Sequence, residues 1–242
     1  MAETVVLLHG FTSTARAWDG VIAALDSGRY RPLALDLRGH GAARDRTPIG
    51  FEEVVADVLE AAPGRFALAG YSMGGRIALH VALAAPERVS ALVLISTSPG
   101  IENDAERAAR GAADGALADE LERMDITTFA DRWAGQSLFA DDPPDVAARA
   151  REDRLRNDPR ALAAALRGLS TGRMPPLWDR LGELRVPTVV IAGERDPKFT
   201  AIARRMAAAL PDARLEVVPE AGHALPVEAP DAVGGAINRL AV

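Results

Sequence analysis

Residues 65–85 read RFALAGYSMGGRIALHVALAA, and this stretch decides the fold. It opens with a short apolar run, Phe66–Ala69, bounded by Gly70, which predicts a buried strand. From Ser72 onward the apolar residues recur at helical spacing. Gly70-Tyr71-Ser72-Met73-Gly74 joins the two elements and matches G-x-S-x-G, the pattern of a serine raised on a tight strand-to-helix turn. We therefore expect Ser72 to be a reactive serine. The simpler alternative is a Gly-rich turn whose serine caps the helix.

Apolar runs and helical patterns alternate on both sides of this stretch. Residues 89–95 form a continuous apolar run, and further strands are predicted at 4–8, 30–36, 188–192 and 214–218. Helical patterns lie near 18–25, 51–62 and 199–210, and a closing helix is predicted from about residue 230. Strands that are apolar on both faces and alternate with helices predict an α/β fold whose parallel sheet is covered on two sides.

Residues 101–182 depart from this alternation. They contain no convincing strand pattern, and their Ala/Arg/Glu-rich helical segments are broken at Asp141-Asp142-Pro143-Pro144, Asn157-Asp158-Pro159 and Met174-Pro175-Pro176. Because strands of one sheet flank this segment, we expect a helical cap inserted into a core formed by residues 1–100 and 183–242.

Composition excludes several classes of protein. The 242 residues, 48% of them hydrophobic, suffice for one large domain, and no run of 18 apolar residues predicts a membrane span. The first residues lack the pattern of a secretory signal, and cysteine is absent, so a cytoplasmic location is expected. The formal net charge of −6 argues against non-specific nucleic-acid binding. Neither metal-ligand spacing nor a phosphate-binding motif occurs, so we expect no metal and no cofactor. Oligomeric state is not indicated.

A reactive serine needs a histidine, and the sequence holds four. His223 directly follows the last predicted strand, where parallel sheets place their ligands, so we expect it to be the base. His80 lies two turns into the serine helix and is expected to be a packed or surface residue of that helix. His9 and His40 lie in loops at strand ends and are expected to stabilise those loops.

The group that orients the histidine should follow the preceding strand, 188–192. The next residues offer Glu194 and Asp196, and Asp196 is preferred because it lies farther beyond the strand end. Its alternative role is to cap the helix that starts near Phe199. Donors for an anion formed in the reaction are expected from the backbone N–H groups of Met73 and Phe11.

Five motifs together resemble the α/β-hydrolase superfamily. They are LLHGF at 7–11, DLRGHG at 36–41, GYSMGG at 70–75, GERD at 193–196 and AGH at 221–223, in the expected order. The order Ser72, Asp196, His223 also matches that of this superfamily. The usual fold has two strands before the HGF strand, so the resemblance implies a sheet of about six strands with the first two absent.

Within the superfamily the sequence is similar to the 2-succinyl-6-hydroxy-2,4-cyclohexadiene-1-carboxylate synthases of menaquinone biosynthesis. The likeness includes the insertion, at ERAARGAADGALADEL (106–121), FADRWAGQSLF (129–139) and ALRGLSTGRMPPLW (165–178), and GERDPKF (193–199). It implies a carbon–oxygen lyase that eliminates pyruvate from a small anionic carboxylate substrate, with the triad as general base. Arg110 and Trp133 match positions that contact substrate in this family, although Arg110 could be a solvated surface residue and Trp133 part of the core of the insertion. Arg76, one helical turn after Ser72 on the same face, can point into the pocket and bind a carboxylate, and Tyr71 lies beside the serine.

Two alternatives stay open at this point. The same triad could serve a serine hydrolase, either a carboxylesterase or an enzyme that cleaves carbon–carbon bonds. The chain could also be a non-catalytic, hydrolase-like binding protein, in which case Ser72→Ala would leave its function intact.

Overall fold

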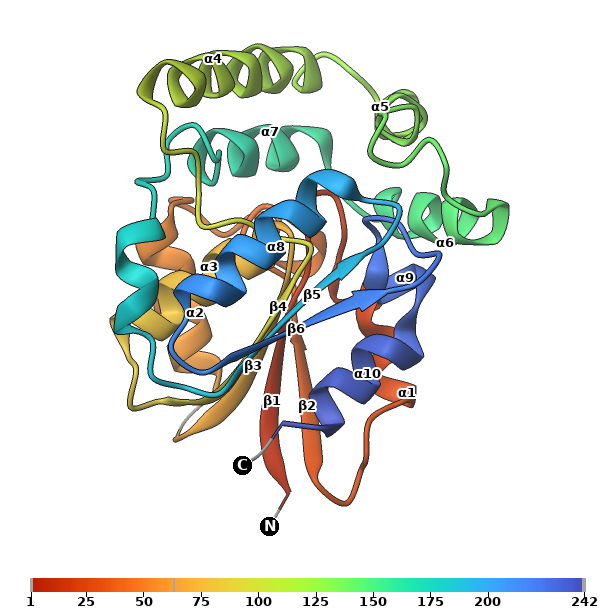
Figure 1. Cartoon of the computed structure of the whole chain (residues 1–242). Coiled ribbons are helices and arrows are strands. Elements are labelled where there is room, and N and C mark those ends of the chain that lie inside the picture. The colour runs from red at the N-terminus through yellow and green to blue at the C-terminus, as the bar shows by residue number, and fades with distance from the viewer. Residues whose placement is uncertain (1, 63, 241–242) are drawn as a thin grey trace.

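Six parallel strands form the centre of the molecule, which is seen in a computed structural model that describes residues 2–62 and 64–240. The sheet order is β2-β1-β3-β4-β5-β6, and every neighbouring pair is parallel (Figure 1). The strands are β1 (Glu3–Leu8), β2 (Tyr30–Leu35), β3 (Phe66–Tyr71), β4 (Val89–Ile95), β5 (Thr188–Gly193) and β6 (Ala213–Val218). The expected α/β class with six strands is confirmed.

Successive residues of the central strands face two separate apolar cores. Val6 and Leu8 of β1 belong to one core, and Val5 and Leu7 belong to the other. Helices α2 (Phe51–Ala61), α3 (Met73–Ala84) and α8 (Pro197–Ala209) cover the first face. Helices α1 (Asp19–Ala23) and α10 (Pro230–Asn238) cover the second. The strands β1, β3, β4 and β5 are almost fully buried because both of their faces are covered.

The structure departs from the sequence prediction most clearly at β3, near residues 18–25 and after His223. Strand β3 continues to Tyr71 because Gly70, expected to end it, pairs with both β1 and β4. The segment near 18–25 is a 3₁₀ turn, η1 (Ala15–Trp18), followed by the short α1, because Thr14 caps the turn early. A short helix, α9 (Leu225–Glu228), follows His223 and was not predicted.

The chain between β4 and β5 is helical. It contains α4 (Asp104–Leu121), α5 (Ile126–Ala134), α6 (Pro144–Arg154), α7 (Pro159–Gly168) and the 3₁₀ helix η3 (Trp178–Glu183), with no strand among its described residues. Helices α4, α5 and α7 share a small apolar core of their own. Figure 1 shows α4 and α7 stacked above the rest of the molecule, with α5 and α6 beside them.

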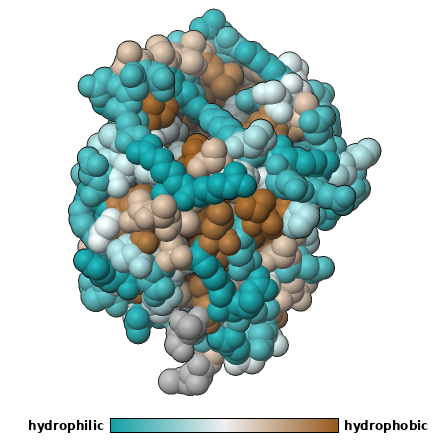
Figure 2. Space-filling model, in the orientation of Figure 1, coloured by the Kyte–Doolittle hydropathy of each residue, from teal (hydrophilic) through white to brown (hydrophobic). Residues whose placement is uncertain are grey.

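The outer surface in the same view is mostly hydrophilic, and apolar side chains gather in patches near its middle (Figure 2). Within the described residues, no helix combines the length and the apolar character that crossing a membrane requires.

Candidate active site

Ser72 lies on a strained turn between β3 and α3. Its backbone has φ 51° and ψ −108°, a region that non-glycine residues rarely adopt. Glycines make the turn possible because there is no room for side chains around it. A Cβ atom at Gly70 would collide with the carbonyl of Gly74, and one at Gly74 would collide with the carbonyl of Leu8. The turn therefore projects the Ser72 side chain away from the sheet.

The structure brings the three predicted residues Ser72, His223 and Asp196 together. His223 Nε2 lies 3.3 Å from Ser72 Oγ, and His223 Nδ1 lies 2.6 Å from Asp196 Oδ2. His223 and Asp196 are buried, and Ser72 is half-buried. The carboxylate accepts a hydrogen bond from Nδ1–H, so this arrangement favours the tautomer in which Nε2 is free to accept the serine proton.

The carboxylate of Asp196 also caps a helix. Its Oδ1 accepts a hydrogen bond of 3.1 Å from the backbone N–H of Phe199, in the first turn of α8. The two roles weighed for Asp196 from the sequence are therefore compatible, since each uses a different oxygen. Glu194, the competing acid, is exposed and accepts a hydrogen bond from the N–H of Glu220 instead.

The loop after β1 leaves one backbone N–H without an acceptor among the described residues. The carbonyl of Gly10 accepts hydrogen bonds from Ser13 N–H at 3.2 Å and from His9 Nδ1 at 2.8 Å. Because a trans peptide is planar, the N–H of Phe11 must point the opposite way from that carbonyl. Within the described part of the chain, neither Phe11 N–H nor Met73 N–H has an acceptor. Both amides are thus available to an anion.

Two neutral histidines hold this loop. His9 Nε2 accepts from Leu37 N–H at 3.0 Å, which leaves Nδ1–H to donate to Gly10. His40 Nε2 accepts from Thr12 N–H at 3.4 Å. Burial lowers the pKa of both imidazoles, that of His40 to about 3, so each keeps an unprotonated nitrogen as acceptor at neutral pH.

A cavity of about 380 Å³ opens beside Ser72, between the strand ends and the helical insertion. Asp196 is shielded from it behind His223, but the other predicted site residues line it: Phe11, Tyr71, Ser72, Met73, Arg76, Arg110, Trp133 and His223. Further lining residues were not assigned a role from the sequence: Gln136, Ser137, Phe139, Ser170, Thr171, Lys198 and Phe199. Most of them lie in the segments that carry the resemblance, which is the signal that could have found them.

Two residues that line the cavity carry buried donors with no acceptor among the described residues. Arg76 donates from Nη2 to the carbonyl of Leu169 at 3.1 Å, but its Nε has no partner among the described residues. Trp133 Nε1 is also buried and without an acceptor there. Burial, with Arg110 nearby, lowers the pKa of the Arg76 guanidinium to about 10, so it stays charged at neutral pH. Such donors favour an anionic ligand.

Arg110 is not a free cation. Its Nε donates to Asp114 Oδ1 at 2.8 Å, and Asp114 Oδ2 accepts from Ser170 Oγ at 2.7 Å. The ion pair uses one edge of the guanidinium and fixes its orientation at the cavity wall. The positive charge that Arg110 offers to a ligand is therefore already partly neutralised by the Asp114 carboxylate.

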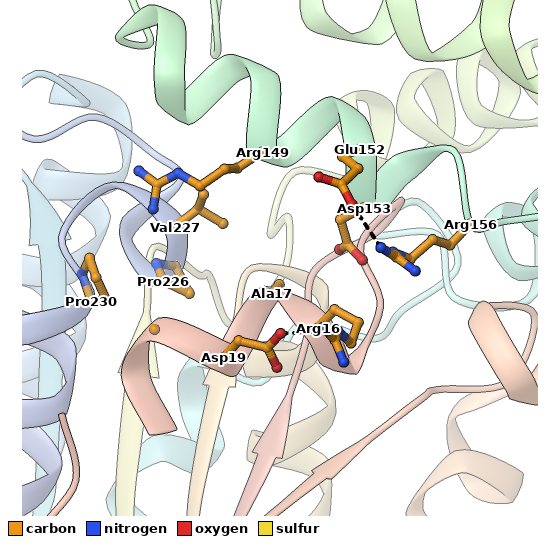
Figure 3. A pocket seen from close by; sticks show the side chains of 11 residues that line it. Arg16, Ala17, Asp19, Arg149, Glu152, Asp153, Arg156, Pro226, Val227 and Pro230 are labelled. Atoms are coloured by element: carbon orange, nitrogen blue, oxygen red, sulfur yellow. Dashed lines mark hydrogen bonds and ion pairs between the residues drawn. The ribbon is translucent and has the colours of Figure 1, made fainter. Parts of the chain in front are cut away.

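A second hollow, of about 210 Å³, lies between α6, η1 and α9 (Figure 3). Its charged side chains are already paired, as Arg16–Asp19, Arg149–Asp145 and Arg156–Glu152, and Asp153 accepts from Thr14. This hollow offers no unpaired group to a ligand.

A parallel sheet with a serine on a strained turn after β3, and a histidine and an acid at the ends of β6 and β5, defines the α/β-hydrolase class. The family model described as "Alpha/beta hydrolase family" matches residues 5–236. The chain belongs to the α/β-hydrolase family.

Its relatives narrow the type of enzyme. A Bacillus subtilis protein named "Putative 2-succinyl-6-hydroxy-2,4-cyclohexadiene-1-carboxylate synthase" is 38% identical over 99% of this chain and 90% of its own length. A solved structure titled "Structure of MenH from S. aureus" superposes with a TM-score of 0.90 at 35% identity, covering 97% of this chain and 91% of the other. These likenesses support an enzyme of the synthase type.

A relative with a different activity also matches well. The pimeloyl-[acyl-carrier protein] methyl ester esterase of Nitrosomonas europaea is 34% identical over 91% of this chain and 88% of its own. The family therefore includes an ester hydrolase at a comparable level of identity.

Proposed function

We propose that the chain is a 2-succinyl-6-hydroxy-2,4-cyclohexadiene-1-carboxylate synthase, a lyase that eliminates pyruvate from 2-succinyl-5-enolpyruvyl-6-hydroxy-3-cyclohexene-1-carboxylate. The observation that carries this proposal is the cavity itself. It combines a serine–histidine base with the charged guanidinium of Arg76 in its lining, as a substrate with several carboxylates requires. In this proposal the helical insertion, residues 101–182, is the cap over the site.

The reaction follows from the names of substrate and product. The proton at ring carbon 2, next to the succinyl ketone, is removed, and the 3-ene becomes the 2,4-diene as the bond from carbon 5 to the enolpyruvyl oxygen breaks. The enolpyruvyl group leaves as the enolate of pyruvate, which takes up a proton at its methylene carbon and becomes pyruvate. Negative charge develops on the ketone oxygen as the proton leaves, so the reaction needs a base and donors for that oxygen.

The triad would act here as a base relay. His223 Nε2 accepts the proton of Ser72 Oγ while that oxygen takes the ring proton, and Asp196 stabilises the imidazolium that forms. The N–H groups of Phe11 and Met73 would stabilise the developing enolate. No acyl-enzyme is needed in this sequence of steps.

The arginines would hold the carboxylates. Arg76 is anchored at Nη2 and lines the cavity, while Arg110 is oriented by Asp114. An arginine fixed in this way can bind a carboxylate through two parallel hydrogen bonds. Trp133 would add its N–H, and Tyr71, next to Ser72, forms part of the wall.

The second candidate is an ester hydrolase, which the esterase relative favours. Ser72 would then attack the ester carbonyl, and the same two amides would stabilise the tetrahedral intermediate. The geometry of the triad serves both reactions, so substrate turnover must separate them.

The deciding experiment generates the substrate with the upstream enzyme and follows pyruvate with a coupled assay. Catalytic pyruvate release that is lost in Ser72→Ala would support the synthase. Efficient hydrolysis of short p-nitrophenyl esters without pyruvate release would contradict this proposal and favour the esterase. Normal function in Ser72→Ala would point to a non-catalytic protein.

A further inference from the structure

The C-terminal end of α6 and the turn after it make a series of polar contacts with the loop that follows β1. Asp153 accepts from the backbone N–H of Thr14 at 2.8 Å and also from its hydroxyl. Arg154 lies with Nε 3.4 Å from Thr12 Oγ1. Figure 3 shows Asp153 pointing from α6 toward the segment that enters η1. The insertion is thus tied to the same loop that carries Phe11.

Asn157 makes the most specific of these contacts because it holds main-chain groups of two loops at once. Its Nδ2 donates to the carbonyl of Thr12 at 2.8 Å, and its Oδ1 accepts from the N–H of Gly41 at 3.0 Å. The side chain is buried, with 6% of its surface exposed. It therefore joins the loop after β1, the loop after β2 and the insertion in one hydrogen-bonded junction.

The loop needs such a junction because Thr12 is strained. Its φ of 71° is in the left-handed region, which a β-branched residue strongly disfavours. This conformation persists only where the surroundings fix it. The N–H of Thr12 is bound by His40 and its carbonyl by Asn157, so both backbone polar groups of the strained residue are held.

The conformation of Thr12 determines where Phe11 points. Phe11 lies between Gly10, whose carbonyl is fixed by Ser13 and His9, and Thr12, whose carbonyl is fixed by Asn157. If Thr12 relaxed to a common backbone conformation, the preceding peptides would rotate with it. The Phe11 N–H would then change its direction relative to the cavity that Phe11 and Ser72 line.

We propose that Asn157 is a positioning residue through which the helical insertion holds the Phe11 N–H in place for the reaction. The inference rests on the proposed role of Phe11 as an anion donor, and it adds that the insertion maintains that donor. Removing the hydrogen bond from Asn157 to the Thr12 carbonyl should weaken stabilisation of the transition state and leave substrate binding in the ground state nearly unchanged.

The test compares Asn157→Asp with a neighbouring control, Asp158→Ala. Asn157→Asp keeps the size of the side chain and its acceptor for Gly41, but it places a carboxylate oxygen against the carbonyl of Thr12. Asp158 caps α7 through the N–H groups of Arg160 and Ala161 and, within the described residues, makes no hydrogen bond to Thr12. The control therefore weakens the same corner of the insertion without touching the loop.

We expect Asn157→Asp to lower kcat for pyruvate release by about 10- to 100-fold with KM within about twofold, since small misplacement of a catalytic group has costs of this order. Asp158→Ala should keep kcat within about twofold. An unchanged kcat in Asn157→Asp, or an equal fall in both variants, would overturn the inference.

Hydrogen exchange of residues 10–14 supplies a readout that does not depend on the reaction. The N–H groups of Thr12 and Ser13 are hydrogen-bonded in the folded protein, so their exchange should accelerate about tenfold or more in Asn157→Asp and stay unchanged in Asp158→Ala. Equal protection in Asn157→Asp and the wild type would refute the inference. A wild type that releases no pyruvate but hydrolyses p-nitrophenyl acetate would disprove the proposed function only. The kcat comparison would then be made with the ester.

Discussion

Asp196 contacts His223 and α8 with different oxygens of one carboxylate. Oδ2 lies 2.6 Å from His223 Nδ1, and Oδ1 accepts from the N–H of Phe199 at 3.1 Å. The helix start thereby fixes the carboxylate that orients the histidine. Chemistry and stability at this residue can be separated, because an amide can replace one of the two functions but not both.

Asp196→Asn should lower activity steeply while the fold keeps its stability. Asparagine caps a helix about as well as aspartate does, but it cannot stabilise a positively charged His223 or select its tautomer. We expect kcat to fall by about 10³- to 10⁴-fold. Asp196→Ala should lose the cap as well, at an additional cost of about 1 kcal/mol in unfolding free energy. Steady-state kinetics and thermal unfolding of the two variants check this; equal stabilities would show that the cap contributes nothing.

Arg76→Gln should act mainly on anionic substrates. The side chain keeps polar hydrogen-bonding groups but loses the charge that would bind a carboxylate, and such hydrogen bonds contribute about 1.5–3 kcal/mol. We expect kcat/KM for pyruvate release to fall by about 10- to 100-fold, while turnover of a neutral p-nitrophenyl ester changes by less than about threefold. Arg76→Lys should restore little, because lysine lacks the planar fork and burial lowers its pKa. An unchanged kcat/KM in Arg76→Gln would remove Arg76 from the site.

Asp142, before α6, should make stability depend on pH. Burial, together with the neighbouring Glu228, raises the pKa of its carboxyl from 3.8 to about 6, and Arg154 and Arg195 oppose the rise only in part. Because the folded state binds this proton more tightly, its contribution to stability is complete below about pH 4. That contribution is lost as pH rises to about 6.

Asp142→Asn removes this dependence. The shift corresponds to about 3 kcal/mol, which solvent screening at a half-buried side chain reduces to about 1 kcal/mol. We expect the variant to be more stable than the wild type by about that amount at pH 8 and nearly equal to it at pH 4. Thermal unfolding at the two pH values measures it. A difference that grew toward acid would contradict the assigned direction.

Much of the fold and the serine turn could be predicted from the sequence because local sequence determines them. Gly70 is required by a contact with the carbonyl of Gly74 inside the turn, and Gly74 by the carbonyl of Leu8 at the end of the neighbouring β1; both glycines are visible in the G-x-S-x-G pattern. The preference for Asp196 over Glu194 followed from distance along the chain beyond β5, and the structure places only Asp196 beside His223. The boundary of β3 was missed because a glycine inside a sheet has the same local signal as a glycine that ends a strand.

Contacts between distant segments could not be predicted. Arg110 and Asp114 are four residues apart on α4, so their ion pair is local. The hydrogen bond from Ser170 to Asp114, in contrast, depends on how α4 packs against the turn after α7. The junction at Asn157 joins the turn after α6 to two loops that lie more than a hundred residues earlier in the chain. In the sequence, Asn157-Asp158-Pro159 indicates only a helix break. No local pattern encodes such a junction.

Lys198, the only lysine of the chain, lines the cavity beside Phe199, which packs against His223. Its side chain is exposed, unlike the more buried Arg76, so it lies where an anionic substrate would enter. A cation in that place raises the local concentration of an anion and speeds its capture, and salt screens the effect within about 10 Å at 0.1 M.

Lys198→Gln should therefore lower kcat/KM for pyruvate release by about threefold to tenfold at low ionic strength, with kcat little changed. The difference from the wild type should shrink toward zero as salt approaches about 1 M, where the screening length is about 3 Å. Arg204→Gln, an exposed change on the same helix α8 but outside the cavity lining, is the matched control and should leave the salt dependence as it is. A loss in Lys198→Gln that persisted at high salt would mean that Lys198 contacts the bound substrate directly, since a desolvated contact is screened far less than an exposed charge.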